Sequence, residues 1–281
     1  MNNIIEKASF NPEFFLVKGY VEPDEVKNFH YHDSFEIYLA LSDGDKYYVN
    51  DKVYPIIEGD LFVFNYKDIH KPVFLPTMVH HNYVIHFMPS YVQDFSTPET
   101  DLLACFTNRG PDFSHRLHLN YEQFQALLPV LKKAEFYYFH PVFGHEIYTK
   151  ILLVEILLLV NSFYHTTTSS SSESKDSEYI KIKPIIDYIN EHIEENLSLA
   201  SLANNFYINK NYLSHLFKKT TGHTVNEYII SRKIILAKEL LRKNLPVIQV
   251  AKMSGFNDYS NFIRTFKKYA GITPKQFIKQ S

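Results

Sequence analysis

The stretch GFNDYSNFIRTFKKYAGITP, from Gly255 to Pro274, decides how the C-terminal part of the chain folds, because an earlier stretch repeats its pattern. That earlier stretch is NKNYLSHLFKKTTGHT, from Asn209 to Thr224, and both contain Phe-Lys-Lys followed three residues later by Gly. The copies align with an offset of 49 residues at Phe217 and Phe266, and with an offset of 48 further upstream. Each copy predicts a helix, a short turn and an amphipathic second helix, which is the outline of a helix-turn-helix unit.

The spacing of apolar residues sorts the faces of these two second helices. Apolar side chains at i, i+3 and i+4 turn toward a core, and the polar stripe between them turns outward. The inward residues are Leu213, Leu216 and Phe217 in the first copy, and Phe262, Phe266 and Tyr269 in the second. The outward residues are Asn211, Ser214, His215 and Lys218, and then Ser260, Arg264, Lys267 and Lys268. Either helix alone could be an ordinary amphipathic helix with a charged outer face.

The rest of residues 179–281 also reads as short, capped helices. Ile182, Ile185, Ile186 and Ile189 mark a first helix, and a second runs from Leu199 to Phe206. Thr224 and Glu227 have capping-box spacing and predict the start of a long helix. Further helices are expected at Val247–Met253 and Ser260–Tyr269, with a short final helix opened by Thr273, Pro274 and Gln276.

Charge is divided unequally along the chain. Residues 179–281 contain 16 Lys and Arg against 7 Asp and Glu, a net charge of +9, whereas residues 1–178 carry −11. Clustered basic residues attract a polyanion such as DNA. An incidental bias in a solvated surface is the alternative interpretation.

NYLSHLFKKTTGHTVNEYI followed by PVIQVAKMSGFNDYSNFIRTFKKYAGITPKQF resembles the DNA-binding domain of the AraC/XylS family of bacterial transcription regulators. The resemblance implies two helix-turn-helix units bridged by a central helix, here residues 225–244. It places base-reading residues at Asn211, Ser214, His215, Tyr259, Ser260 and Arg264, with phosphate contacts at Lys218, Lys219, Lys267 and Lys268.

His215 departs from the family, because many relatives carry arginine at that position. A neutral imidazole lacks the bidentate fork that reads guanine, so the first unit is expected to read bases more weakly. Arg264 keeps the fork and is the strongest candidate for specificity. Ile263 either lies at the edge of the core or contacts a thymine methyl group.

The N-terminal part of the chain has a different pattern of apolar residues. Short apolar runs of strand character, EIYLAL, KYYVN, LFVFN, PVFL and NYVIHF, lie within residues 14–87 and are separated by turn signals. Closely spaced short strands favour a sandwich or a barrel. Residues 90–164 look helical, and the apolar run ILLVEILLLV at 151–160 needs cover on two sides. That cover could be the strand region together with a second subunit, or burial within one chain.

The segment FHYHDSFEIYLAL contains His30, His32 and Glu36, whose even separations would place them on one face of a strand. With His70 they form a set able to hold Zn, Fe or Mn. Residues 29–87 resemble the cupin barrel, whose enzymes bind metal with such a set. In AraC-type regulators the resemblance implies an effector pocket instead, here His32, Glu36, Tyr38, Tyr48, Phe64 and His70. A sugar is one candidate effector. Structural roles are the default for His80, His81, His115, His118 and His140.

We therefore expect two domains. The first, residues 1–164, is an all-β cupin-like barrel (about 14–87) with a helical extension (about 90–164). A Ser/Thr-rich linker follows at 165–178, and residues 179–281 form an all-α domain with two helix-turn-helix motifs. One cysteine, Cys105, and the lack of an 18-residue apolar run favour a cytoplasmic protein without a membrane segment.

The function expected is that of an effector-responsive transcription regulator rather than an enzyme. Its expected partners are double-stranded DNA, a small-molecule effector and a second subunit, with RNA polymerase as a further candidate. No cofactor is required, although a divalent metal could bind in the barrel. The alternatives are a metal-dependent cupin enzyme with a DNA-binding appendage and a non-sensing architectural DNA-binding protein.

Overall fold

The computed structural model describes residues 13–21, 30–50, 52–75, 77–110, 113–166, 177–221 and 223–280. The chain divides into two compact units, Met1–Ser174 and Lys175–Ser281, and each is described by itself. Most of the predicted linker, residues 167–176, lies outside the described residues. The helices extend into both ends of that predicted linker, because one ends at Thr166 and the next begins at Ser177.

The first unit contains two antiparallel sheets. Its strands are β1 (Phe14–Val21), β2 (Phe35–Ala40), β3 (Lys46–Val49), β4 (Lys52–Pro55), β5 (Asp60–Phe64), β6 (His70–Val73), β7 (His80–Phe87) and β8 (Arg116–His118). A five-stranded sheet has the order β1-β7-β2-β5-β8, and a three-stranded sheet has the order β4-β3-β6. The predicted closed barrel is therefore wrong for the described residues. Within the part of the chain that the structure describes, one isolated bridge pairs His30 with His70 of β6.

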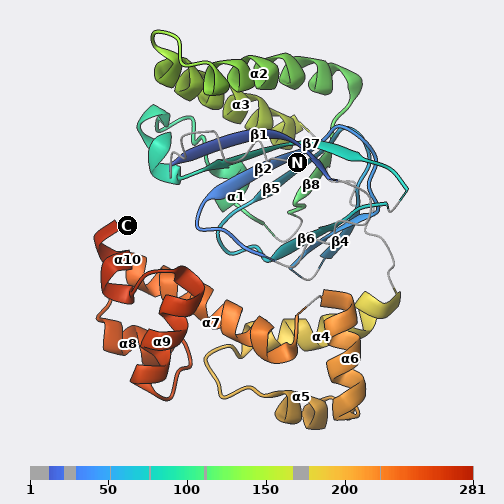
Figure 1. The fold of residues 1–281 in the computed structure, drawn as a ribbon, viewed down its shortest axis with the longest axis vertical. Coiled ribbons are helices and arrows are strands. Elements are labelled where there is room, and N and C mark those ends of the chain that lie inside the picture. Colours follow the sequence, from blue (N-terminus) through green and yellow to red (C-terminus); the bar gives the residue numbers. More distant parts are fainter. Residues whose placement is uncertain are drawn as a thin grey trace. The chain divides into compact units, whose positions relative to one another are not determined.

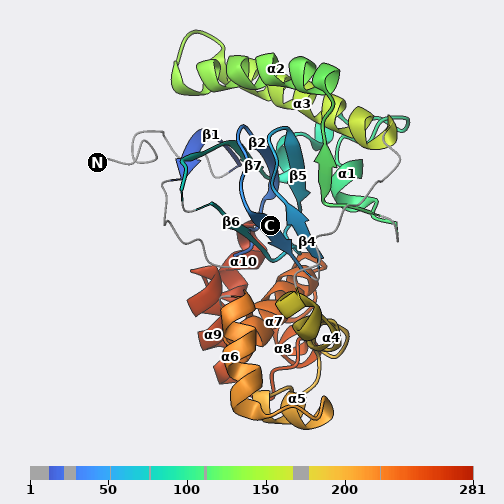
Figure 2. The ribbon, with the colours of Figure 1, turned by 90° about the vertical axis from the view of Figure 1, so that its right-hand side faces the viewer.

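The first unit is built in three layers, with helices on one side of the larger sheet and the smaller sheet on the other (Figures 1 and 2). Strand β2 is buried along its whole length because both of its faces are covered. Phe35, Ile37 and Leu39 face the helices. Tyr38 and Ala40 face the smaller sheet, as strand alternation requires. Glu36 shares the face of Tyr38, so a carboxylate lies between the two sheets.

Helices follow the strands. The short ones are η2 (Pro89–Tyr91), η3 (Gln93–Phe95) and α1 (Ala104–Thr107), and the long ones are α2 (Tyr121–Phe139) and α3 (His145–Thr166). α3 is long and apolar enough to cross a membrane by length and composition alone. Its inner face lies in the core of this unit, where Leu153, Ile156 and Val160 are fully buried. Cys105 packs in the same core, and burial raises the pKa of its thiol, as suits a small apolar side chain.

Every regular element among the described residues of the second unit is a helix. Its helices are α4 (Ser177–Glu191), α5 (Leu199–Asn205), α6 (Lys210–Thr221), α7 (Val225–Arg242), α8 (Val247–Met253), α9 (Tyr259–Ala270) and α10 (Pro274–Gln280). The predicted capping box of α7 is present, because the Thr224 side chain accepts from the Glu227 amide and the Glu227 carboxylate accepts from the Thr224 amide. The predicted bounds of α8 are confirmed, and α9 is one residue longer at each end than predicted.

Residues that correspond in the sequence repeat are also buried at corresponding positions in the structure. Phe217 and Phe266, 49 residues apart, are both fully buried, and so are Leu202 and Val250, 48 residues apart. The turns also correspond, since Tyr207 and Gly255 both have left-handed backbone angles, with φ of 54° and 76°. Tyr207, a residue type that rarely adopts this conformation, is 98% exposed, so its ring has no part in the turn's packing.

Candidate nucleic-acid interface and histidine cluster

The outer face of α6 is polar along its whole length. Leu213, Leu216 and Phe217 hold the inner face in the core, as predicted. The Asn209 side chain accepts hydrogen bonds from the amides of Asn211 and Tyr212 and so orders the first turn. On the outer side Asn211, His215, Lys218 and Lys219 are exposed and Ser214 is half-buried.

Helix α9 presents the same arrangement. The Asp258 side chain accepts from the Asn261 amide at the start of the helix, and Gly271 ends it with φ of 75°. Phe262 and Phe266 are fully buried. Tyr259, Ser260, Arg264, Lys267 and Lys268 are exposed, and so is Asn261. The structure thus gathers the predicted base-reading residues of each unit on one helix face, with two lysines at the C-terminal end.

This order suits a DNA duplex. A major groove admits one α-helix, base edges in the groove offer hydrogen-bonding groups, and flanking phosphates attract lysines. The polar stripe of neither helix packs into its own core, because the apolar residues and the caps hold each helix in place. The face is therefore available to a partner.

Five polar side chains meet between the sheets of the first unit: His30, His32, Glu36, His70 and His86. Ligand atoms of His30, His32 and His70 lie within 4.8 Å of one another, and so do those of His32, Glu36 and His86. The predicted single strand carrying three of them is wrong, because the chain bends at residues 33–34 before β2 begins. That bend still brings His32 Nε2 to 3.1 Å from Glu36 Oε2.

His86 was not included in the predicted ligand set. It joins the cluster because antiparallel pairing of β2 with β7 places it opposite Glu36. No sequence spacing signals that pairing. Burial lowers the pKa of His86 to about 4, although the Glu36 carboxylate opposes this effect. Burial alone would raise the pKa of Glu36, but His86 and His70 together hold it well below its usual value.

Two buried atoms in this cluster face each other without a hydrogen bond. Glu36 Oε2 and His70 Nε2 are 3.1 Å apart, as are Glu36 Oε2 and His32 Nε2, but within the described residues neither Glu36 Oε2 nor His70 Nε2 meets the geometry of a hydrogen bond. His70 Nδ1 lies 3.0 Å from the Asp68 carbonyl oxygen, which can only accept, so Nδ1 carries the proton. If Nε2 carries no proton, it presents a lone pair to a carboxylate oxygen. That arrangement needs a proton or a cation between the two atoms.

The predicted aromatic walls are largely packed against one another. The Tyr38 ring contacts Tyr47 edge-on, with 5.3 Å between centroids, and its hydroxyl bonds His80. Phe64 stacks on His70 with 4.2 Å between centroids. Tyr47, which the prediction omitted, lies among these rings, whereas Tyr48 is on the opposite face of β3.

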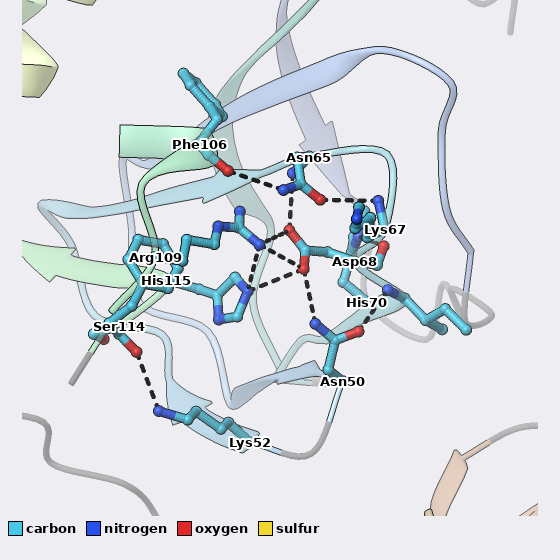
Figure 3. A network of polar contacts seen from close by, with 12 residues as sticks. Asn50, Lys52, Asn65, Lys67, Asp68, His70, Phe106, Arg109, Ser114 and His115 are labelled. Carbon is cyan, nitrogen blue, oxygen red and sulfur yellow. Dashed lines mark hydrogen bonds and ion pairs between the residues drawn. The ribbon is translucent and has the colours of Figure 1, made fainter. Parts of the chain in front are cut away.

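A second polar network, centred on Asp68, adjoins the cluster (Figure 3). Arg109 Nη1 donates to Asp68 Oδ2 at 2.8 Å, and His115 Nε2 lies 3.1 Å from Oδ1. Asn50 Nδ2 and the Asn65 amide also donate to this carboxylate, each at 2.8 Å. Burial alone would raise the pKa of Asp68, but His115, Arg109 and the Asn65 amide hold it well below its usual value. Burial lowers the pKa of His115 itself, so the structural role expected for this histidine fits its surroundings.

Comparisons with known proteins agree with the helical geometry. A helix-turn-helix domain model matches residues 202–280. The multiple antibiotic resistance protein MarA of Escherichia coli is 34% identical over 104 residues, which are 37% of this chain and 82% of MarA. The uncharacterized HTH-type transcriptional regulator YijO of Escherichia coli is 41% identical over 97 residues, 34% of each chain.

The paired helices and these matches define a helix-turn-helix DNA-binding protein. The chain belongs to the AraC/XylS family of transcriptional regulators. Among solved structures, ToxT from Vibrio cholerae with a bound unsaturated fatty acid matches 95% of both chains, at 14% identity and a TM-score of 0.41. These values are too low to transfer the ligand of ToxT to this chain.

Proposed function

We propose that this regulator binds specific double-stranded DNA through two helix-turn-helix units, α5–α6 and α8–α9, and that its N-terminal unit senses a small ligand at the histidine cluster. The observation that carries the DNA-binding part is the matched exposure of α6 and α9. The base-reading residues are Asn211, Ser214, His215, Tyr259, Ser260 and Arg264, and the phosphate-binding residues are Lys218, Lys219, Lys267 and Lys268. A DNA partner implies a cytoplasmic location. Contact with RNA polymerase stays a prediction.

A footprint on the DNA that flanks the gene tests this proposal. Two protected grooves, about 10 base pairs apart on one side of the duplex, are expected from two recognition helices on one protein. Protection of a single groove would contradict the two-unit reading. A footprint that follows no sequence would instead support an architectural role.

The ligand class best supported at the cluster is a divalent transition metal ion rather than a sugar. The aromatic faces on which a sugar would stack are occupied by other rings. The Glu36 Oε2 atom, 3.1 Å from both His32 Nε2 and His70 Nε2, suits a cation, and imidazole with carboxylate is a donor set that Zn, Fe and Ni accept. His70 also has the carbonyl partner on its other nitrogen that metal-ligating histidines usually have. A metal there would bridge the two sheets.

Metal content of purified protein measures this prediction. Wild-type protein loaded with Zn²⁺ and desalted is expected to retain about one equivalent, and His70→Ala is expected to bind at least tenfold more weakly. The matched control is His81→Ala, because His81 is an exposed histidine on β7. Equal metal retention by wild type and His70→Ala would refute the site. Metal-dependent turnover of a substrate would support the alternative of a metal-dependent enzyme. The similarity to transcriptional regulators argues against that alternative.

Pairing of two subunits through α3 is the remaining part of the proposal. Ile147, Ile151 and Leu158 are 47–60% exposed on its outer face, and with Val154 they follow the 4-3-4 spacing of a helix-pairing seam. A copy of the same helix would cover this seam by two-fold symmetry. It would place two DNA-binding units in one particle and raise affinity through effective concentration.

The seam is tested by Ile151→Lys, which would bury a charge in the pairing face. We expect sedimentation analysis to show a dimer for wild type and a monomer for the variant at micromolar concentration. Lys132→Glu changes the charge of an exposed position on α2, outside the seam, and serves as the control. A monomeric wild-type protein, or a dimeric Ile151→Lys, would rule out this interface.

A further inference from the structure

The two halves of the DNA-binding unit have separate cores on one central helix. Near the start of α7, Tyr228 packs edge-on against Phe217 of α6, with 5.6 Å between ring centroids. Further along, Ile234 and Leu241 belong to the core that contains Phe266 of α9. If α7 were the only connection, small bending of this helix would change the separation of α6 and α9.

Lys233 lies on α7 at the point where these two cores meet. Its ammonium nitrogen donates to the carbonyl of Glu195, after α4, at 2.9 Å. It also donates to the carbonyl of Gly255, in the turn between α8 and α9, at 2.6 Å. The residue is 7% exposed, which is unusual for a lysine, and burial lowers its pKa. One side chain therefore joins backbone from both halves.

Gly255 allows this contact. A Cβ atom at this position would lie 2.8 Å from the carbonyl oxygens of Ile193 and Glu194 and 2.8 Å from Lys233 Nζ. The turn of the second half thus sits directly on the chain that follows α4. The corresponding residue of the first half, Tyr207, is fully exposed and makes no such junction. The repeat departs from symmetry at the place where the two halves touch.

We propose that Lys233 is a positioning residue that fixes the separation and rotational phase of α6 and α9, so that the protein reads the spacing between two half-sites. It touches no base. Successive major grooves on one side of B-DNA are about 10–10.5 base pairs apart, so one base pair of extra spacing rotates the second site by about 35°. If α6 and α9 are held rigidly, they cannot both bind after that rotation. If they are joined by a hinge, they can. The inference rests on the proposed use of both helices on one duplex.

Selection of binding sites from random DNA by the full chain tests the clamp. Wild type is expected to enrich two motifs at one fixed spacing. Lys233→Met, which keeps the side-chain length and loses both donors, is expected to enrich the same two motifs over a range of spacings. It should also bind the fixed-spacing DNA about tenfold more weakly, because the second helix is no longer held in place. Lys243→Met removes an exposed charge just after the same helix and should leave the spacing unchanged.

A second variant approaches the junction from the other side. Gly255→Ala keeps the lysine but places a methyl group against the Ile193 and Glu194 carbonyls, and it should shift or broaden the spacing in the same way. Thermal unfolding shows whether either variant has lost its fold. If one has, the half-site spacing selected by the other variant tests the clamp. Unchanged spacing in a folded variant of either kind overturns the clamp. A wild type that enriches only one motif overturns the two-helix proposal instead, so the two failures are distinct.

Discussion

Replacing Asp68 with Asn is expected to destabilise the N-terminal unit by about 3–5 kcal/mol, the usual loss when one partner of a buried ion pair is removed. The Asp68 carboxylate accepts from Arg109, His115, Asn50 and the Asn65 amide, and an amide side chain cannot accept from all four. Urea unfolding of the full chain, followed by near-ultraviolet circular dichroism, measures the effect. Asp94→Asn, at an exposed position, should change stability by less than about 0.5 kcal/mol.

The loss should depend on pH in a defined direction. The pKa of Asp68 is depressed in the folded protein, so its contribution is present above the ordinary carboxyl pKa of about 3.9 and disappears as the pH falls below that value. The stabilities of wild type and Asp68→Asn should therefore converge in acid. A difference that grows as the pH falls would show that the carboxylate is not the stabilising group.

Replacing Arg264 with Ala is expected to weaken binding to the selected DNA by about 1–3 kcal/mol, because a bidentate contact to guanine is lost. The side chain is exposed on α9 in the stripe that also contains Ser260 and Lys268. Binding to random DNA should change far less, since it depends on charge more than on hydrogen-bond geometry. Fluorescence anisotropy with both DNAs at fixed salt measures the difference.

Lys268→Ala on the same helix is the matched comparison. It should weaken binding to both DNAs alike and reduce the salt dependence by about one phosphate contact. If Arg264→Ala weakens selected and random DNA equally, its assigned role in base reading is wrong. The pair of variants thus separates recognition from attraction on one helix.

The helical unit could be predicted well because its signals are local. The capping box marks the start of α7, and the 3.6-residue period marks the bounds of α8. The outward stripes of α6 and α9 followed from the same period. No local signal indicated Lys233 as a junction, because its two acceptors lie 38 and 22 residues away in sequence.

The sheet unit was harder because its features depend on distant pairings. β8 has three residues, too few to show a period, and is defined by its pairing with β5. Closure into a barrel was expected, but the strands divide into two sheets. Tyr48 was named as a pocket residue, whereas its neighbour Tyr47 lies among the inter-sheet rings, because adjacent residues of a strand face opposite sides. His86 entered the cluster through the register of β2 and β7.

The loop at His115 also has a mechanical consequence. The Tyr164 hydroxyl, two residues before the end of α3, donates to the His115 carbonyl, and its ring stacks on Phe113. His115 contacts the Asp68 carboxylate, and the Asp68 carbonyl accepts a hydrogen bond from the His70 imidazole. A displacement of that imidazole cannot stay local without rupturing one of these three bonds. The last turn of α3 and the histidines between the sheets are therefore expected to move together as long as these hydrogen bonds are kept.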